Sequence, residues 1–413
     1  MATIKPFNAI RPAADKAKEI AALPYDVYNR KEAAEVVKNN PGSFLAIDRA
    51  ETAFDPSVDM YSDEVYQKAH DLLWQWVDEG RFITDDKDCY YVYEQIMDGR
   101  HQTGIVALAS IDDYANGVIK KHENTRAEKE ADRIRHVDET NAQTGPIFLA
   151  YRAVDTIKKI VESTKKGTPV YDILAEDGIA HKVWIINDDN DIDVIKSEFN
   201  KMNAIYIADG HHRAASAVKV GQKRRAAKAN YTGEEEFNFF LSVLFPDDEL
   251  RIYDYNRVVK DLNGLSSDEL KAKIAGSADV IRTSTEEIRP ETKGQFSMFL
   301  DGEWTLYQFK ASVQSSDPVE GLDVSLLQNN VLAPILGIAD PKTDSRIDFV
   351  GGIRGLGELV KRCNEDCKVA FAMYPTSISE LFDVADASLL MPPKSTWFEP
   401  KLRSGLFIHK LDY

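Results

Sequence analysis

Cysteine is scarce in this sequence, which places only Cys89, Cys363 and Cys367 among its 413 residues. So few cysteines, and an odd number of them, argue against the disulfide framework of a small secreted domain. Cys363 and Cys367 stand four residues apart with no second pair, so the four-ligand pattern of a structural zinc site is missing. We therefore expect ordinary, partly buried thiols.

Basic residues are outnumbered by acidic ones, with 51 Lys and Arg against 68 Asp and Glu. The formal net charge is −17 at pH 7, which argues against nucleic acid as a partner because a phosphate backbone needs a basic face. A small anion in a local basic pocket stays compatible with this balance. No stretch approaches the roughly 20 apolar residues of a membrane helix, and the first residues, MATIKPFNAIRP, have no apolar signal core. We expect a cytoplasmic protein without a membrane partner.

Several widespread catalytic and nucleotide-binding motifs are missing as well. The chain has no G-x-x-x-x-G-K-[ST] loop and no G-x-G-x-x-G that opens a helix after a clear strand. It has neither a G-x-S-x-G elbow nor an H-E-x-x-H pair. The glycine-rich segment DFVGGIRGLGEL (348–359) is therefore interpreted as a tight loop.

Helical and strand patterns are present throughout, and 43% of the residues are hydrophobic, enough for a sizeable core. Hairpins are predicted at Asp98-Gly99 and Asp301-Gly302, because Asp-Gly is a strong two-residue turn signal. The apolar runs 183–188 and 204–209 flank a helical segment, which suggests a βαβ unit. The sequence predicts an α/β class protein with a mixed α+β arrangement.

The segment IADGHHRAASA (207–217) is the strongest candidate site. Asp209 ends an expected strand and is a favoured helix N-cap, and Gly210 lets the backbone approach a ligand closely. The following amides and the guanidinium of Arg213 suit a phosphate. The alternative is a capped helix whose two histidines are surface groups. A metal site is disfavoured, because His211 and His212 diverge by roughly 100° on a helix.

Two further segments carry cations that suit an anion. After His122 and Glu123, a helix is expected to place four basic residues on one stripe, where like charges repel unless an anion or an acidic surface relieves them. These four are Arg126, Lys129, Arg133 and His136. The alternative is a solvated helix face. Near the C-terminus, the proline-stiffened segment PPKSTWFEPK offers Lys394, Ser395, Thr396 and Lys401, with an ordinary exposed turn as the alternative.

Five blocks in order resemble the large bacterial and archaeal family called domain of unknown function 1015. They are IKPFNAIRP (4–12), LPYDVYNRKEA (23–33), KHENTRAEKEADR (121–133), IYIADGHHR (205–213) and MPPKSTWFEPKL (391–402). The Asp-Gly-His-His-Arg block is also similar to the nucleotide-phosphate loop of the ParB and sulfiredoxin superfamily, which includes free-serine kinases. The resemblance implies a ParB/sulfiredoxin-like nucleotide-binding core elaborated with a second, intertwined lobe. We expect the core in residues 1–246 and an α/β lobe in 247–413, whose last loop and strand return to the active cleft.

The resemblance further implies a kinase that transfers a phosphoryl group from ATP or ADP, with Mg²⁺, to a small hydroxyl compound such as free L-serine. The expected catalytic residues are Asp26, Glu123, Asp209 and His211, with Mg²⁺ near Glu123 or Asp209. The expected phosphate-binding residues are Gly210, His212, Arg213, Arg126, Arg133, Lys394, Ser395, Thr396 and Lys401. A nucleotide-sensing protein without catalysis and a hydrolase of a phosphorylated metabolite stay open as alternatives, and so does a homodimer.

Overall fold

The chain forms two compact units. The computed structural model describes residues 1–125 and 127–412, with the backbone alone for Lys129. The first unit contains residues 1–250 together with the final segment 400–413, and the second contains residues 251–399. Helices and sheets occur in both units, so the predicted mixed α/β class is confirmed.

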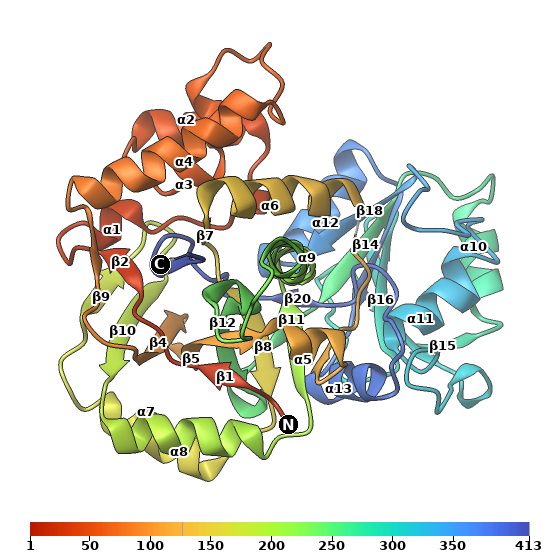
Figure 1. Ribbon diagram of the computed structural model, residues 1–413. Coiled ribbons are helices and arrows are strands. Elements are labelled where there is room, and N and C mark those ends of the chain that lie inside the picture. Colours follow the sequence, from red (N-terminus) through yellow and green to blue (C-terminus); the bar gives the residue numbers. More distant parts are fainter. Residues whose placement is uncertain (126, 413) are drawn as a thin grey trace. The chain divides into compact units, whose positions relative to one another are not determined.

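The first unit is built on one large mixed sheet with the order β6-β11-β8-β12-β5-β4-β10-β9, and β1 pairs with β5 (Figure 1). Its strands are β1 (Ile4–Lys5), β4 (Tyr90–Met97), β5 (Arg100–Ser110), β6 (Ile119–Lys120), β8 (Ile147–Tyr151), β9 (Tyr171–Leu174), β10 (Ala180–Ile186), β11 (Ile205–Asp209) and β12 (Phe239–Pro246). The predicted hairpin joins β4 to β5. Asp98 and Gly99 turn with φ of 52° and 76°, the left-handed values that an Asp-Gly hairpin turn requires.

Two pairs of helices pack beside this sheet. Figure 1 shows α7 and α8 side by side along it, and α6 against α9, which is seen end-on. The helices of the first unit are α1 (Ala17–Ile20), α2 (Arg30–Asn39), α3 (Leu45–Asp48), α4 (Asp63–Asp78), α5 (Ile111–Ala115), α6 (Ala127–Thr140), α7 (Asp155–Thr164), α8 (Asp189–Asn200) and α9 (His211–Ala227). Short 3₁₀ turns span Tyr25–Val27, Ala50–Ala53, Glu236–Asn238 and Asp247–Glu249. Small residues of α9, among them Ala214 and Ala217, are buried in the core that the sheet forms with α7 and α8.

The predicted βαβ unit forms with its strands apart, because β10 and β11 run parallel in one sheet and α8 joins them. The helix α8 does connect β10 to β11, but the two strands are not neighbours. The order of the sheet places β8, β12, β5 and β4 between them. β8 pairs antiparallel with β11 and β4 pairs antiparallel with β10, so strands from elsewhere in the chain separate the two strands of this unit.

The end of the chain closes the first unit. The strand β21 (His409–Lys410) pairs with β7 (Ala142–Gln143), and single bridges join Ile408 to Ile10 and Ser404 to Ala22. Near these bridges, β2 (Ile10–Pro12) pairs with β3 (Phe82–Thr84). The final segment thereby contacts both the N-terminal part of this unit and the strand that precedes β8.

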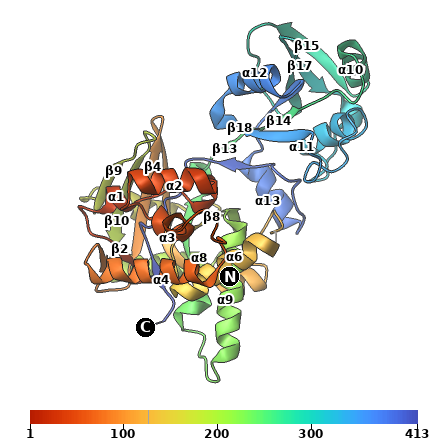
Figure 2. The same ribbon diagram turned by 90° about the horizontal axis from the view of Figure 1, so that it is seen from above.

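The second unit is a six-stranded antiparallel sheet with the order β15-β17-β16-β19-β14-β18 (Figure 2). Its elements are β13 (Ile252–Tyr253), β14 (Tyr255–Val259), α10 (Ser267–Ile274), β15 (Ala278–Ser284), β16 (Gln295–Leu300), β17 (Glu303–Phe309), α11 (Asp323–Leu327), β18 (Ile347–Gly351), α12 (Leu356–Glu365), β19 (Val369–Met373), α13 (Ile378–Asp386) and β20 (Trp397–Phe398). Short 3₁₀ turns span Ala311–Val313 and Gly352–Arg354, and a π-helical segment spans Gln328–Leu332. The second predicted hairpin joins β16 to β17 through Asp301-Gly302. Leu356 and Leu359 of α12 pack with Trp304 in a core on this sheet.

A buried carboxyl group makes the stability of the second unit depend on pH. Asp323 is 7% exposed, and both of its oxygens accept from the amide of Gly294 at 2.9 Å. Burial raises its pKa from 3.8 to about 7, the nearby Glu380 adds to the rise, and the Gly294 bond and Lys293 oppose it. The folded state therefore holds this proton more tightly than the unfolded state does.

We expect stability to fall as pH rises from about 4 to about 7 and to level off above, by up to about 4 kcal/mol from this group. Urea unfolding between pH 4 and pH 8 measures the change. The control is Asp323→Asn, which keeps an oxygen acceptor for Gly294 and should show a flatter profile. Identical pH profiles for the two proteins would contradict the assignment.

Candidate functional site

The helix α9 begins directly at the end of β11, as the sequence predicts, but its cap differs. The N-cap is Gly210, with φ of 92° and no capping side chain, so the prediction that Asp209 caps the helix is wrong. The Asp209 carboxylate is engaged elsewhere: Oδ1 accepts from the Gly210 amide at 2.8 Å and Oδ2 accepts from Lys401 Nζ at 3.0 Å. No side chain of the cap residue therefore covers the first turn of α9.

Asp209 is held in its charged form. Burial raises its pKa, but Lys401 and Arg213 act more strongly in the opposite direction, so the pKa of this carboxyl lies well below its usual range. A carboxylate of this kind does not take up a proton near neutral pH. Asp209 positions Lys401 and the start of α9 through these contacts, and its catalytic role stays a prediction.

His211 is buried against a second histidine. Its ring and that of His122 lie 4.5 Å apart, centre to centre, at an angle of 90°. Burial lowers the pKa of both rings, that of His122 to about 4. Nε2 of His211 is buried and has no hydrogen-bond partner among the described residues. Both histidines are neutral at pH 7, so they cannot supply positive charge there.

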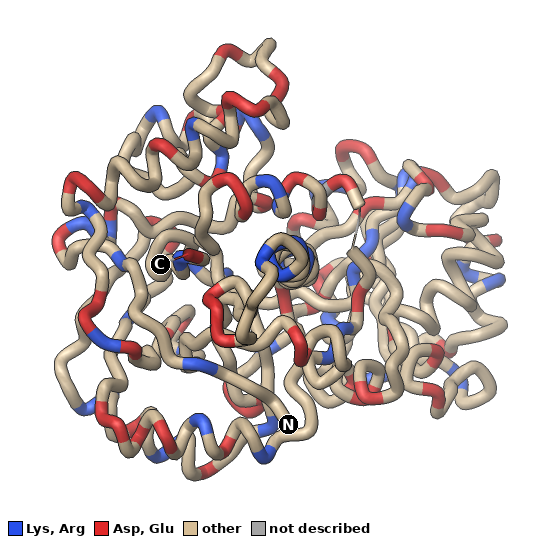
Figure 3. The backbone as a smooth tube through the Cα atoms, in the orientation of Figure 1, with Lys and Arg blue, Asp and Glu red and all other residues tan. Residues whose placement is uncertain are grey.

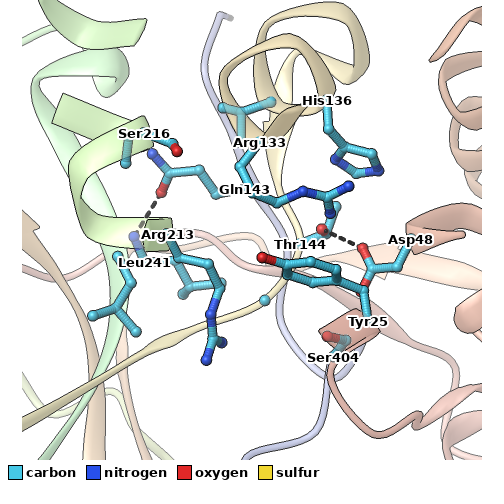
Figure 4. A pocket seen from close by; sticks show the side chains of 14 residues that line it. Tyr25, Asp48, Arg133, His136, Gln143, Thr144, Arg213, Ser216, Leu241 and Ser404 are labelled. Carbon is cyan, nitrogen blue, oxygen red and sulfur yellow. Dashed lines mark hydrogen bonds between the residues drawn. The ribbon is translucent and has the colours of Figure 1, made fainter. Parts of the chain in front are cut away.

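Arg213 supplies that charge. Its guanidinium group lies against Gly210, where a Cβ would be 3.1 Å from Nη2. Its Nη1 donates to the carbonyl oxygen of Pro146 at 2.6 Å, and its side chain lines a pocket (Figure 4). Within the described part of the chain, no carboxylate lies at ion-pair distance from it. Figure 3 shows further Lys and Arg residues along α9.

The opposite wall of this pocket comes from α6. Arg133 is 8% exposed, and its Cζ lies 3.9 Å from the ring centre of Tyr25. Asp132 accepts from its Nε at 2.9 Å. Burial lowers the pKa of Arg133, but Asp132, Tyr25 and Asp48 more than offset this, so it stays charged. The pocket therefore has a guanidinium group on two walls.

The predicted stripe on α6 is partly a buried feature. His136 is 4% exposed, its Nε2 lies 3.3 Å from the carbonyl oxygen of Ile47, and burial lowers its pKa to about 4. The interpretation as a solvated face is therefore wrong for Arg133 and His136, because α6 turns this side toward the pocket and α4. Arg126 and the side chain of Lys129 lie outside the described residues.

One carboxylate lines the same pocket as the two guanidinium groups and lies near that of Arg133. Asp48, the last residue of α3, is 4% exposed, and its Oδ1 accepts from Thr144 Oγ1 at 2.9 Å (Figure 4). The sequence analysis missed Asp48, and no local spacing could have found it, because Thr144 lies 96 residues further along. The wall is completed by Tyr25, His136, Val137, Gln143, Gly145, Ile147, Ser216, Ala217, Leu241 and Ser404.

A second pocket shares a wall with the first. Four residues, Tyr25, Asp48, Arg133 and His136, line both. The second pocket also contains the exposed Asp26 and a buried ion pair in which Arg49 Nε lies 2.6 Å from Glu51 Oε1. Its remaining lining includes the tyrosines Tyr28, Tyr61 and Tyr66. The two pockets place cations, the buried acids Asp48 and Glu51, and aromatic rings around adjoining spaces.

The other predicted residues lie outside these two pockets. Glu123 is half-buried between β6 and α6, and His212 is half-buried on the first turn of α9, where its charge influences Glu130. Lys401 lies beside Asp209, as described above. Lys394, Ser395 and Thr396 belong to the second unit, in the segment before β20. Their role as phosphate ligands stays a prediction.

The described residues include no group of three or more His, Cys, Asp or Glu side chains that could hold a metal ion. None of the helices in the described part of the chain is long and apolar enough to cross a membrane.

The comparisons with known proteins identify the family. Residues 4–325 match the family described as "Protein of unknown function (DUF1015)", so the chain belongs to this family, as the sequence blocks predicted. No curated protein matches the sequence.

Similar solved structures include a mutant free serine kinase in complex with ADP, at 13% identity and a TM-score of 0.36, covering 71% of this chain and 87% of that one. SbnI from Staphylococcus aureus, with a C-terminal truncation, shows 12% identity and a TM-score of 0.37, covering 71% of this chain and 82% of that one. A conserved hypothetical protein from Pyrococcus furiosus shows 15% identity and a TM-score of 0.33, covering 73% and 93%. At these distances the functional argument rests on the side chains of this chain.

The position of Arg213 above Gly210 gives a testable prediction. In Gly210→Ala the new methyl group would meet the guanidinium group of Arg213 and would also require a left-handed alanine. Gly99→Ala is the matched control, because its φ of 76° is similar but no atom lies within 4 Å of the added Cβ. Each variant should lose about 1–2 kcal/mol of unfolding free energy.

Only Gly210→Ala should also weaken the binding of inorganic phosphate, because only this change displaces Arg213. Urea unfolding and equilibrium dialysis measure the two effects. Equal phosphate binding by the two variants would show that the position of the Arg213 guanidinium group against Gly210 does not affect phosphate binding.

Proposed function

We propose that this protein is a small-molecule kinase that transfers a phosphoryl group from ATP or ADP to a hydroxyl group, with free L-serine as the first acceptor to test. The observation that supports this proposal is the pocket that Arg213 and Arg133 line from different helices with a single buried carboxylate, Asp48. Phosphoryl transfer mainly requires positioning and stabilisation of charge, which fixed guanidinium groups supply.

The phosphates of the donor would bind at the uncapped start of α9. Positive charge there comes from Arg213, and from Arg133 across the pocket, because His211 is neutral. The amides of the first turn favour an anion through the helix dipole. Arg213 can contact two phosphate oxygens at once, as a planar guanidinium group does.

Any Mg²⁺ would have to arrive with the nucleotide. Mg²⁺ in nucleotide sites takes most of its ligands from phosphates and water, with one or two protein carboxylates. The chemistry of the described donors fits such an ion, because Asp48 is a carboxylate near Arg133 and Asp209 is a carboxylate near Arg213. When bound, the ion would offset phosphate charge.

The acceptor would occupy the second pocket. Its hydroxyl would be oriented and deprotonated by a carboxylate, for which the sequence proposed Asp26 and Glu123. Asp48 is a third candidate, and its position on the shared wall favours it, since the base must reach both the acceptor and the transferred group. Thr144 fixes the orientation of this carboxylate through its hydroxyl group.

The activity test uses purified protein, Mg-ATP or Mg-ADP, and a panel of hydroxyl amino acids, with the phosphorylated product measured by mass spectrometry. Arg213→Ala should lower kcat/KM by at least about 100-fold, because the charge on the transferring group loses a fixed cation. Arg225→Ala is the matched control: it removes an arginine at the far end of the same helix, where Asp112 pairs with it at 2.6 Å.

The alternatives predict different results in this assay. A sensing protein would bind nucleotide without forming product, and a hydrolase would release phosphate from phosphoserine without nucleotide. Absence of a phosphorylated product with every acceptor and both nucleotides would refute the kinase proposal.

Substitution of the candidate bases separates their roles. We expect Asp48→Asn to lower kcat by roughly 100-fold or more, the usual effect of losing a general base, while the amide oxygen still accepts from Thr144. Asp26→Asn and Glu123→Gln should retain most of the activity. A wild-type rate for Asp48→Asn, together with loss of activity in Asp26→Asn or Glu123→Gln, would reassign the base to that residue.

A further inference from the structure

The second unit contains a buried arginine that the proposed function does not use. Arg257 lies in the middle of β14, is 3% exposed, and sits between Phe349 of β18 and Phe371 of β19 in the register of the sheet. Its Cζ lies 5.4 Å from the ring centre of Phe349. A guanidinium group in such apolar surroundings is unusual, because a buried charge is normally paired with an opposite charge.

Only backbone oxygens partner this group among the described residues. Nη1 donates to the carbonyl oxygen of Tyr255, and Nη2 donates to that of Lys394 at 3.1 Å. No described carboxylate lies at ion-pair distance from Arg257. Burial lowers the pKa of Arg257 to about 10, and no described carboxylate compensates for this. The charge of Arg257 is therefore solvated by dipoles alone.

The neighbouring acids already have donors. Asp254, three residues before Arg257, accepts from Asn256 Nδ2 at 2.6 Å, and its Oδ1 lies 3.9 Å from Arg289 Nη1. Glu399, at the end of the loop that contacts Arg257, accepts from Trp397 Nε1 at 3.0 Å. Neither of these recorded contacts brings a negative charge to the guanidinium group.

The loop that covers Arg257 brings a second cation. Lys394 is exposed, adopts the left-handed region with φ of 60°, and holds its Nζ 5.4 Å from the ring centre of Tyr255. The described residues place no carboxylate at ion-pair distance from it. The loop is fixed on both sides of Ser395, whose Oγ donates to the Pro392 carbonyl at 2.6 Å and whose carbonyl accepts from Thr376 Oγ1 at 3.0 Å.

We propose that Arg257 and Lys394 form a second anion-binding site, which takes a small phosphate-type oxyanion. A lysine in a strained backbone conformation keeps its carbonyl on Arg257 and its ammonium group over Tyr255, the residue that also partners Arg257. Both cations thus contact Tyr255, the first residue of β14, and no described carboxylate lies at ion-pair distance from either of them. An oxyanion with two or more charges would offset both. This site does not depend on the kinase proposal, because all of its residues belong to the second unit.

Equilibrium dialysis of the full-length protein against radiolabelled inorganic phosphate tests the site. Wild-type protein should bind two phosphates per chain, one at Arg213 and one at Arg257. Lys394→Ala, a change of an exposed side chain, should remove one of them or weaken it at least tenfold, and Arg257→Gln should do the same. Lys271→Ala is the control, since this partly exposed lysine of the same unit pairs with Glu303 at 3.2 Å.

The outcomes separate the two proposals. If Arg213→Ala alone removes phosphate and Lys394→Ala binds as the wild type does, Arg257 is a clamp for the loop and the second site is refuted. If Lys394→Ala removes the phosphate that the wild type binds while Arg213→Ala keeps it, the second site is supported. The phosphate site at Arg213 and the start of α9 is then refuted. Equal loss in Lys271→Ala would show a general effect of charge and would also refute the second site.

Discussion

The ion pair between Lys401 and Asp209 ties the returning end of the chain to the start of α9, and the first unit depends on this return. The partners are 192 residues apart, and the intervening chain includes the whole second unit. The same final segment places Ser404 on the pocket wall and joins β21 to β7. The candidate site therefore cannot be complete until Ser404 has been made, and its assembly carries the loop-closure cost of very distant contacts.

The burial of guanidinium groups is the second constraint on the fold. The protein compensates the charge of these groups in different ways. Arg133 has Asp132 beside it and Asp48 near it, so its charge costs little and its position is fixed. Arg213 has a carbonyl oxygen for a partner, and Asp209, whose pKa it helps to lower, is already bonded to Lys401. A cation that is held in place but incompletely neutralised is the arrangement that stabilises an incoming negative charge without further rearrangement.

Local patterns in the sequence were sufficient for the parts of the fold that depend on neighbouring residues. Both Asp-Gly hairpins and the strand-to-helix step at 205–227 form as predicted, because turn chemistry and periodicity act over a few residues. The sheet neighbours of β10 and β11 could not be predicted in this way, since they are strands from distant segments of the chain. The same holds for Asp48 and Ser404, which reach the pocket through tertiary packing alone. The cap at Gly210 was missed because Lys401, far along the chain, takes the carboxylate of Asp209.

The arrangement of the two pockets bears on the choice between transfer, sensing and hydrolysis. A sensor needs only a binding site for the anion, and a hydrolase needs a positioned water molecule but no space for a second organic substrate. Here the pocket with two guanidinium groups shares Tyr25, Asp48, Arg133 and His136 with a second space lined by tyrosines. An orienting carboxylate on the shared wall is useful when two molecules must meet there, since it can face the hydroxyl of one and the phosphoryl group of the other. This shared wall is the physical reason for ranking transfer above the two alternatives.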